Sequence, residues 1–169
     1  MKEMTKKALE EALAGESQAH IKYLAFAEKA EKEGHGSIAR LFKAIAEAER
    51  VHATNHMKEL GLLSDTMDNL KSAKTGEGFE IDEMYPAYNA VAELQEEKGA
   101  MRTIHYAEEA EKIHEALYEE AIETLKDGKD FREGNVYICP VCGYTHVGDD
   151  IPEKCPVCGV SNSMFKKFE

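Results

Sequence analysis

The sequence lacks tryptophan and contains only four prolines in 169 residues, so few positions interrupt a regular backbone. It also lacks any apolar run of about 18 residues, the length that a membrane-spanning helix requires. Its N-terminal residues are charged and do not form the apolar stretch of a signal peptide. Hydrophobic residues make up 43% of the chain and charged residues 32%, a composition typical of soluble helical proteins. We therefore expect a helical protein of the cytoplasm with no membrane partner.

Basic residues are scarce. The chain contains 21 lysines and arginines but 33 acidic residues, so its net charge is −12. A surface of this charge repels phosphate backbones, and no basic cluster offsets it. We therefore expect no nucleic-acid partner. Most of the acidic side chains need only keep the protein in solution, so the informative ones are those on apolar helix faces.

Helical periodicity predicts four helical elements, at residues 5–34, 37–60, 75–97 and 100–126. Pro86 falls inside the third element, which leaves open a kinked helix from Thr75 or a straight helix from Pro86. Residues 61–74 are expected to form a long connection, as in ferritin-like bundles that join parallel helices by a crossover. The predicted fold is an all-α four-helix bundle over residues 1–128, with a small β domain stapled by metal at residues 135–169.

All four cysteines lie in the last 31 residues, a segment too short to fold around an apolar core of its own. They form two Cys-Pro-Val-Cys-Gly motifs, Cys139 with Cys142 and Cys155 with Cys158. Four thiolates in two such pairs suit tetrahedral iron or zinc. The glycine after each pair lets backbone N–H groups approach the sulfurs, which tunes a redox metal. The spacing alone leaves both metals open, and a structural zinc ribbon is the alternative to a redox iron.

The segment from Val136 to Tyr144, together with the second motif from Cys155 to Gly159, resembles a rubredoxin domain of the short-loop kind. Rubredoxins hold one iron through four cysteines and carry single electrons. The resemblance therefore implies an electron-carrying iron in the C-terminal domain.

Two Glu-x-x-His motifs fall in the second and fourth predicted helices, Glu49 with His52 and Glu111 with His114. Residues three apart share a helix face, so each motif can present a carboxylate and an imidazole to one point. Di-metal carboxylate bundles combine two such motifs with one glutamate from each of the other two helices. Glu16 and Glu77 are the candidates, because they precede the motif glutamates by 33 and 34 residues and each follows a glycine.

The apolar residues beside these motifs predict that the glutamates point into the bundle. Buried carboxylates cost several kcal/mol each unless they protonate or bind a cation. Four glutamates balance two divalent ions, and a glutamate-rich site with one histidine per metal favours iron or manganese. His20 and His56 are further candidates to face this site. Glu83, Glu93 and Glu96 are the alternatives for the ligand from the third helix.

The chain as a whole resembles rubrerythrin, in which a ferritin-like di-iron bundle precedes a rubredoxin domain. The resemblance covers nearly the full length and implies five permanent iron ligands: Glu16, Glu49, Glu77, Glu111 and His114. Among these, Glu49 and Glu111 are the implied bridging pair. It further implies that Glu80 and His52 alternate on one iron, and that Tyr23 and Tyr85 lie near the centre.

The activity that this resemblance implies is a peroxidase, an enzyme that reduces hydrogen peroxide to water in oxidative-stress defence. Its electrons come from NAD(P)H by way of an external reductase or rubredoxin, and they pass through the protein's own cysteine-held iron. The implied catalytic residues are Glu80, His52, Tyr23 and Tyr85. Two other functions stay open: ferritin-type iron oxidation and storage, and a metal or redox sensor with a structural zinc ribbon.

The assembly prediction follows from the length of the last helix. Fifteen helical residues after Glu111 span about 23 Å, which would place the C-terminal domain far from the di-iron site of its own chain. Electron transfer between the subunits of a head-to-tail homodimer is therefore expected, because closed two-fold dimers are the commonest assembly. The long connection at 61–74 also permits an exchange of helical hairpins between the two chains.

Overall fold

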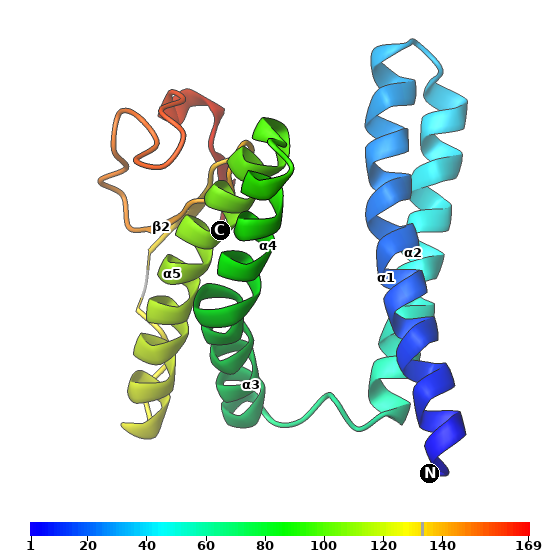
Figure 1. The fold of residues 1–169 in the computed structure, drawn as a ribbon. Helices are drawn as coiled ribbons and strands as arrows, with labels where there is room; N and C mark the ends of the chain where they lie inside the picture. Colours follow the sequence, from blue (N-terminus) through cyan, green and yellow to red (C-terminus); the bar gives the residue numbers. More distant parts are fainter. Residues whose placement is uncertain (133) are drawn as a thin grey trace. The chain divides into compact units, whose positions relative to one another are not determined.

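The computed structural model describes residues 1–132 and 134–169. These residues form two compact units, Met1–Ser64 and Asp65–Glu169. The first unit is a hairpin of two helices, α1 (Glu3–Lys32) and α2 (Gly36–Glu59) (Figure 1). The second unit begins with another hairpin. Its first arm runs without a break through α3 (Thr66–Phe79), the π-helical segment η1 (Glu80–Met84) and α4 (Tyr85–Leu94), and its second arm is α5 (Lys98–Lys126).

The second unit ends in a small domain with a three-stranded antiparallel sheet. Its strands are β1 (Val136–Ile138), β2 (Thr145–Val147) and β3 (Lys166–Phe168), and the 3-10 helix η2 (Asn162–Met164) precedes the last strand. The sheet order is β2-β1-β3, so the central strand β1 pairs Tyr137 with His146 on one side and with Lys167 on the other.

The predicted fold class is confirmed. The described part of the chain contains the four long helical elements of a ferritin-like bundle, arranged as two hairpins, followed by a small β domain that gathers four cysteines. Within the described residues, no helix is both long and apolar enough to cross a membrane.

The first hairpin packs through alanines and leaves its large apolar side chains uncovered. Its buried residues are Ala27, Ala30, Ala39, Ala46 and Ala53. Three of them recur every seven residues on α2, the spacing of a seam between two helices. Exposed large apolar residues on the same helices are Ile21, Leu24, Phe26, Ile38, Leu41, Ile45 and Val51. Helices with an apolar stripe of this size require a further packing partner.

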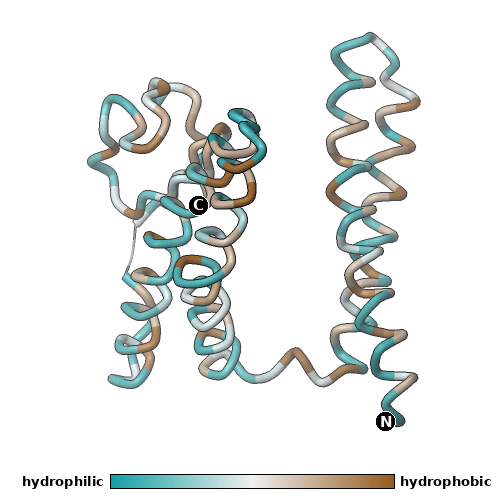
Figure 2. Tube along the Cα trace, in the orientation of Figure 1, coloured by the Kyte–Doolittle hydropathy of each residue, from teal (hydrophilic) through white to brown (hydrophobic). Residues whose placement is uncertain are grey.

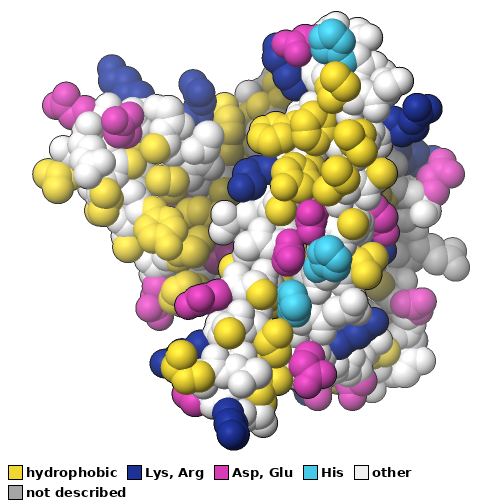
Figure 3. All heavy atoms as spheres, turned by 90° about the vertical axis from the view of Figure 1, so that its right-hand side faces the viewer, with side chains coloured by type: hydrophobic (Ala, Val, Ile, Leu, Met, Phe, Trp, Pro, Cys, Tyr) yellow, Lys and Arg dark blue, Asp and Glu magenta, His cyan; other side chains and the backbone are white. Residues whose placement is uncertain are grey.

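Figures 2 and 3 show how apolar and polar residues are distributed on the hairpin α1–α2. Apolar and polar positions alternate along both helices, so each is amphipathic (Figure 2). One face of the hairpin gathers a continuous area of hydrophobic side chains with acidic and histidine side chains beside it (Figure 3). The second hairpin likewise leaves apolar side chains exposed, among them Phe79, Val91 and Leu94.

The third helical element starts earlier than the sequence pattern predicted. It begins at Thr66 rather than Thr75 because Asp65 caps it: the carboxylate accepts a hydrogen bond from the backbone N–H of Asp68 at 2.9 Å. The expected connection at 61–74 is therefore wrong in length, and the link between α2 and α3 contains only residues 60–65.

Pro86 neither starts this element nor breaks it. A proline inside a helix lacks an N–H donor and clashes with the carbonyl four residues earlier. The π-helical segment η1 ends two residues before Pro86, and such a local widening relieves the clash while the helix continues. Single π turns of this kind often occur at functional sites, and Glu80 lies in this one.

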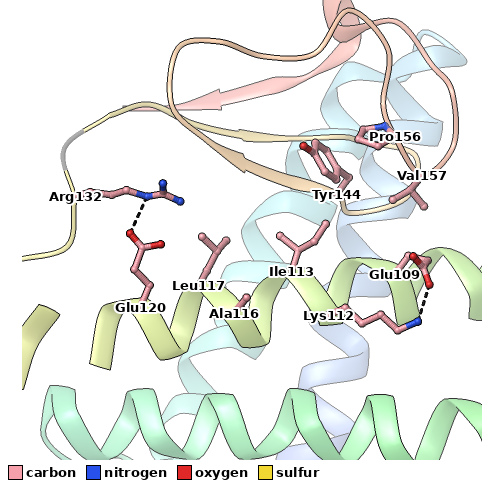
Figure 4. A pocket seen from close by; sticks show the side chains of 10 residues that line it. All are labelled: Glu109, Lys112, Ile113, Ala116, Leu117, Glu120, Arg132, Tyr144, Pro156 and Val157. Carbon is pink, nitrogen blue, oxygen red and sulfur yellow. Dashed lines mark hydrogen bonds and ion pairs between the residues drawn. The ribbon is translucent and has the colours of Figure 1, made fainter. Parts of the chain in front are cut away.

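The C-terminal domain packs against α5, which corrects the expectation that it stands at the far end of this helix. Tyr144, Pro156 and Val157 face α5 across a cavity of about 480 Å³, with Ile113 and Leu117 on the helix side (Figure 4). Arg132 and Glu120 lie at one end of this cavity and form an ion pair there. Nε of Arg132 is 3.2 Å from Oε1 of Glu120. The chain that follows α5 thus returns along the helix, and the separation of about 23 Å on which the head-to-tail prediction depended is absent.

Candidate metal centres

The four cysteines converge as their spacing predicted. Cys139, Cys142, Cys155 and Cys158 place their sulfurs within 4.8 Å of one another. The closest pairs are Cys142 with Cys155 at 3.4 Å and Cys139 with Cys158 at 3.6 Å. A disulfide would require about 2.05 Å, whereas a tetrahedral metal with bonds of about 2.3 Å separates its thiolates by about 3.8 Å. The spacing is that of a metal site.

Two matching turns shape this cysteine site. In each, the glycine after the second cysteine donates its N–H to the first cysteine's carbonyl: Gly143 to Cys139 at 3.0 Å and Gly159 to Cys155 at 2.9 Å. Both glycines have positive φ angles, 81° and 77°, which side chains with a Cβ rarely adopt. The glycine of each Cys-Pro-Val-Cys-Gly motif is therefore needed for the backbone turn, and the two cysteines provide the ligands.

Burial opposes the ionisation of three thiols in this site. Burial raises the pKa of Cys142 well above its usual range, and burial likewise raises that of Cys158. Burial also opposes ionisation of Cys155, but backbone N–H groups of Cys158 and Val157 donate to its sulfur and hold its pKa below the usual value. Such N–H donors stabilise a negative thiolate centre.

The first unit holds one glutamate–histidine cluster. Glu16 on α1 meets Glu49 and His52 on α2, with the three ligand atoms within 4.8 Å of one another. His52 Nδ1 lies 3.0 Å from Glu49 Oε2 and 3.8 Å from Glu16 Oε1. The Glu49 side chain is 16% exposed and that of His52 is 55% exposed, so the carboxylate is the more firmly enclosed of the two.

The second unit repeats this arrangement with its own hairpin. Glu77 on α3 meets Glu111 and His114 on α5, again with ligand atoms within 4.8 Å of one another. His114 Nδ1 lies 2.6 Å from Glu111 Oε2. Each hairpin thus provides one glutamate from one helix and a Glu-x-x-His pair from the other, as the internal repeat of the sequence predicted.

Burial and neighbouring carboxylates raise the pKa of two glutamates at the second cluster. Burial, a hydrogen bond with Glu111 and the charges of Glu111, Glu80 and Glu115 raise the pKa of Glu77 from 4.5 to about 7. The pKa of Glu80 is also raised, first by burial and then by Glu111. Repulsion of this kind is relieved by a proton or by a bound cation.

Two tyrosines lie beside the second cluster. Burial and the charges of Glu80, Glu111 and Glu77 raise the pKa of Tyr85. Burial and the charges of Glu77 and Glu111 also raise the pKa of Tyr118. Sequence reasoning gave Tyr118 no role, although it follows His114 by four residues on α5.

A third neighbour of this cluster comes from the C-terminal domain. His114 Nε2 lies 2.7 Å from Thr145 Oγ1 at the start of β2. Sequence reasoning missed Thr145, and no local signal could have found it, because the two residues are 31 positions apart and meet only through the packing of the C-terminal domain on α5.

Other candidates lie outside the two clusters. The ring of Tyr23 packs against the rings of Phe26 and Phe42, and its centroid lies 6.2 Å from the centroid of each. His20 Nδ1 donates a hydrogen bond to the carbonyl of Ala46 at 2.7 Å. Among the described residues, the metal-competent clusters do not include His56, Glu80, Glu83, Glu93 or Glu96. From the third helical element it is therefore Glu77, not its alternatives, that meets Glu111.

The donor sets fit iron in both kinds of site. Carboxylates with one imidazole per cluster are ligands that suit iron, and four thiolates suit a tetrahedral iron or zinc. When the ions are bound, the glutamate–histidine residues would hold a metal pair and the cysteines a single ion.

Comparisons with known proteins agree with these donor sets. The family model for rubrerythrin matches residues 7–122, and the model for the rubredoxin-like domain of rubrerythrin matches residues 137–166. Rubrerythrin-2 of Clostridium acetobutylicum is 46% identical, with 98% of this chain and 97% of that protein covered. Nigerythrin of Nitratidesulfovibrio vulgaris is 37% identical, with 95% and 84% covered.

Solved structures give the same result. A mixed-valence state of nigerythrin aligns with a TM-score of 0.58 and 34% identity, covering 97% of this chain and 86% of that one. A fully reduced, all-ferrous state of nigerythrin aligns with the same TM-score and 33% identity. The chain therefore belongs to the rubrerythrin family, whose di-iron centre suits the glutamate–histidine clusters and whose rubredoxin-type iron suits the four cysteines.

Proposed function

We propose that this member of a family of di-iron oxidoreductases is a peroxidase that reduces hydrogen peroxide to water in oxidative-stress defence. The observation that carries the proposal is the hydrogen bond between His114 of a carboxylate cluster and Thr145 of the cysteine domain. An iron-storage protein has no use for an electron carrier held against its carboxylate site. A zinc-ribbon sensor has no use for two glutamate–histidine clusters.

The two clusters are the two halves of one di-iron site in this proposal. Glu16 and Glu49 contribute two negative charges, and Glu77 and Glu111 contribute two more, so two divalent ions are neutralised. With metal bound, Glu49 and Glu111 would be shared by the two ions, and His52 and His114 would each hold one ion. The matching composition of the clusters supports this assignment.

When bound, a diferrous pair supplies the two electrons that reduction of one hydrogen peroxide to two waters consumes, and the reaction also consumes two protons. The protein's own residues must deliver these protons to the peroxide oxygens. Glu80 and Tyr85 are the proposed donors, because both lie close enough to Glu111 for its charge, after burial, to raise the pKa of each. Tyr23 is the corresponding tyrosine proposed for the first hairpin.

Two residues are proposed to exchange on one iron. When the metal pair is bound, its oxidation would add two positive charges, and the carboxylate of Glu80 would then be favoured over the neutral imidazole of His52. His52 is free to move because its side chain is 55% exposed. Glu80 lies in the π-helical segment η1, where the backbone departs from regular α-helix.

Electrons are proposed to enter at the cysteine site from an external NAD(P)H-linked reductase or rubredoxin. Cys158 is the partly exposed cysteine, whereas the other three are buried. From this site the connection to His114 runs through Thr145, whose hydroxyl donates to the carbonyl of Gly143 at 3.2 Å. Gly143 is bonded directly to Cys142, so the relay needs no second subunit to reach His114.

The assembly that we propose is a homodimer in which the hairpins are exchanged. Ferritin-like bundles join their two hairpins by a long crossover, and α2 with its 24 residues is about 36 Å long. The link at residues 60–65 spans at most about 25 Å even when fully extended. Two chains that exchange hairpins satisfy this limit and also cover the exposed apolar side chains of each hairpin.

A peroxide assay tests the proposed activity. The iron-loaded protein, supplied with NADH and an external reductase, is expected to consume one NADH per hydrogen peroxide. Glu111→Ala is expected to bind one iron per chain instead of three and to lose this activity, while the red colour of the cysteine site persists. Glu83→Gln, an exposed residue of the same region, serves as the control that retains both.

The same assay separates the other functions. Uptake of many irons with slow peroxide consumption would favour storage, and a colourless protein with zinc in the cysteine site would favour a sensor. Three irons bound by Glu111→Ala would show that the ligand assignment is wrong.

The two cluster histidines are expected to differ. His114→Ala should lose iron from the di-iron site, because this histidine is a permanent ligand. His52→Ala should keep most of its iron but reduce peroxide about 10-fold more slowly or worse, because it binds only in the reduced state. Iron analysis and peroxide turnover on both variants check this, and equal iron loss in the two would refute the exchange of ligands.

The raised pKa of Glu77 predicts a pH dependence for the protein depleted of di-iron metal. A carboxyl with a pKa of about 7 stabilises the fold fully below pH 4.5, and this contribution is lost as the pH rises through 7. Glu77→Gln stays neutral, so it should match the wild type near pH 4.5 and unfold at higher denaturant concentration above pH 7. Denaturation at pH 5, 6, 7 and 8 measures this, with Glu83→Gln as control. A difference that does not grow with pH would contradict it.

Hairpin exchange predicts complementation between two damaged chains. Glu49→Ala damages the first hairpin and Glu111→Ala the second. In a mixed exchanged dimer, one site receives both lesions and the other receives none, so about half of the wild-type peroxidase activity should return. Differently tagged chains are co-expressed, and the mixed dimers are purified and assayed for iron and turnover.

The matched control places both lesions in the first hairpin, by co-expression of Glu16→Ala with Glu49→Ala. Every site of that exchanged dimer carries one lesion, so no activity should return. Mixed dimers of Glu49→Ala with Glu111→Ala that form but stay inactive would show that each chain builds its own bundle.

A further inference from the structure

Thr145 is the buried polar residue of the described chain, with 9% of its surface exposed. It stands at the start of β2 in the cysteine domain, yet its hydroxyl reaches the imidazole of His114 on α5 at 2.7 Å. A buried hydroxyl needs partners for its hydrogen bonds, and here both partners are known. They determine which atom donates in each bond.

The hydroxyl has a single proton, and that proton is used within the cysteine domain. Thr145 Oγ1 donates to the carbonyl of Gly143 at 3.2 Å. Toward His114 the oxygen is therefore the acceptor, and Nε2 of the ring must carry the hydrogen that is donated. In a neutral imidazole, the other nitrogen, Nδ1, then has a free lone pair.

That free nitrogen is the one that faces the carboxylate cluster. His114 Nδ1 lies 2.6 Å from Glu111 Oε2, and both atoms have lone pairs when the ring holds its proton on Nε2. Two such atoms repel one another unless a cation lies beside them. The hydroxyl of Thr145 thus orients the ring and selects the tautomer that a metal beside Glu111 requires.

We propose that Thr145 is a positioning residue of the metal site, which acts through His114 to hold Nδ1 as the ligand atom. The proposal rests on the proposed di-iron assignment, but it concerns metal binding rather than peroxide chemistry. Partners that fix a ligating histidine in this way typically change metal affinity 10- to 100-fold when they are removed.

Two substitutions separate the hydroxyl from the packing at this position. Thr145→Val keeps the shape but lacks the hydroxyl, and Thr145→Ser keeps the hydroxyl but lacks the methyl group. Thr145→Val is expected to lose di-iron metal to a chelator about 10-fold more readily, whereas Thr145→Ser stays near the wild type. Thr124→Val is the control, because the hydroxyl of this threonine donates to the carbonyl of Glu120 within α5.

The red colour of the cysteine site reports whether each variant has folded. With that colour present, equal metal retention by Thr145→Val and the wild type would overturn the proposal. Equal weakening of Thr145→Val and Thr145→Ser would also overturn it, because packing would then account for the loss.

A measurement on the unaltered protein keeps the test decisive even if Thr145→Val does not fold. The di-iron site is loaded with zinc, and the two ring nitrogens of His114 are observed by ¹⁵N NMR. We expect a proton on Nε2 and metal on Nδ1, and the reverse assignment would overturn the proposal. Because neither readout uses peroxide, a protein that passes both tests but does not reduce peroxide would contradict the proposed function alone.

Discussion

The repulsion among acidic groups on partly buried helix faces is the constraint on which the rest of the structure depends. Glu77 and Glu111 approach within the reach of a single ion, and burial together with the neighbouring carboxylates raises the pKa of Glu77 to about 7. In the C-terminal domain, burial likewise raises the pKa of the Cys142 and Cys158 thiols. Cations relieve both clusters, because burial makes uncompensated charge costly and a bound metal replaces the lost solvation.

This constraint accounts for the division of the bundle into two similar hairpins. Each hairpin brings one glutamate to a Glu-x-x-His pair, and each leaves large apolar side chains exposed beside that cluster. Neither half alone has enough ligands for two metals or enough cover for its apolar face. In the exchanged dimer that we propose, the contact between hairpins would complete both, and metal binding and dimer assembly would then stabilise one another.

The position of the C-terminal domain changes the expected relay of electrons. A domain at the far end of α5 would have needed a second subunit to approach the carboxylates. Its sheet instead lies along α5, and Thr145 joins His114 to the backbone that carries Cys142. The cysteine domain therefore contacts the hairpin to which it is covalently attached.

The sequence by itself determined the donor sets and the fold class. Cysteine spacing and the i, i+3 placement of Glu49 with His52 and of Glu111 with His114 are local, since backbone geometry over a few residues brings such atoms together. The start of α3 is also encoded locally, by the N-terminal cap of Asp65, but sequence reasoning overlooked this cap. The contact of Thr145 with His114 and the return of the C-terminal domain along α5 were decided only by the tertiary structure. They depend on packing between segments far apart in the chain, which no periodicity or motif within either segment encodes.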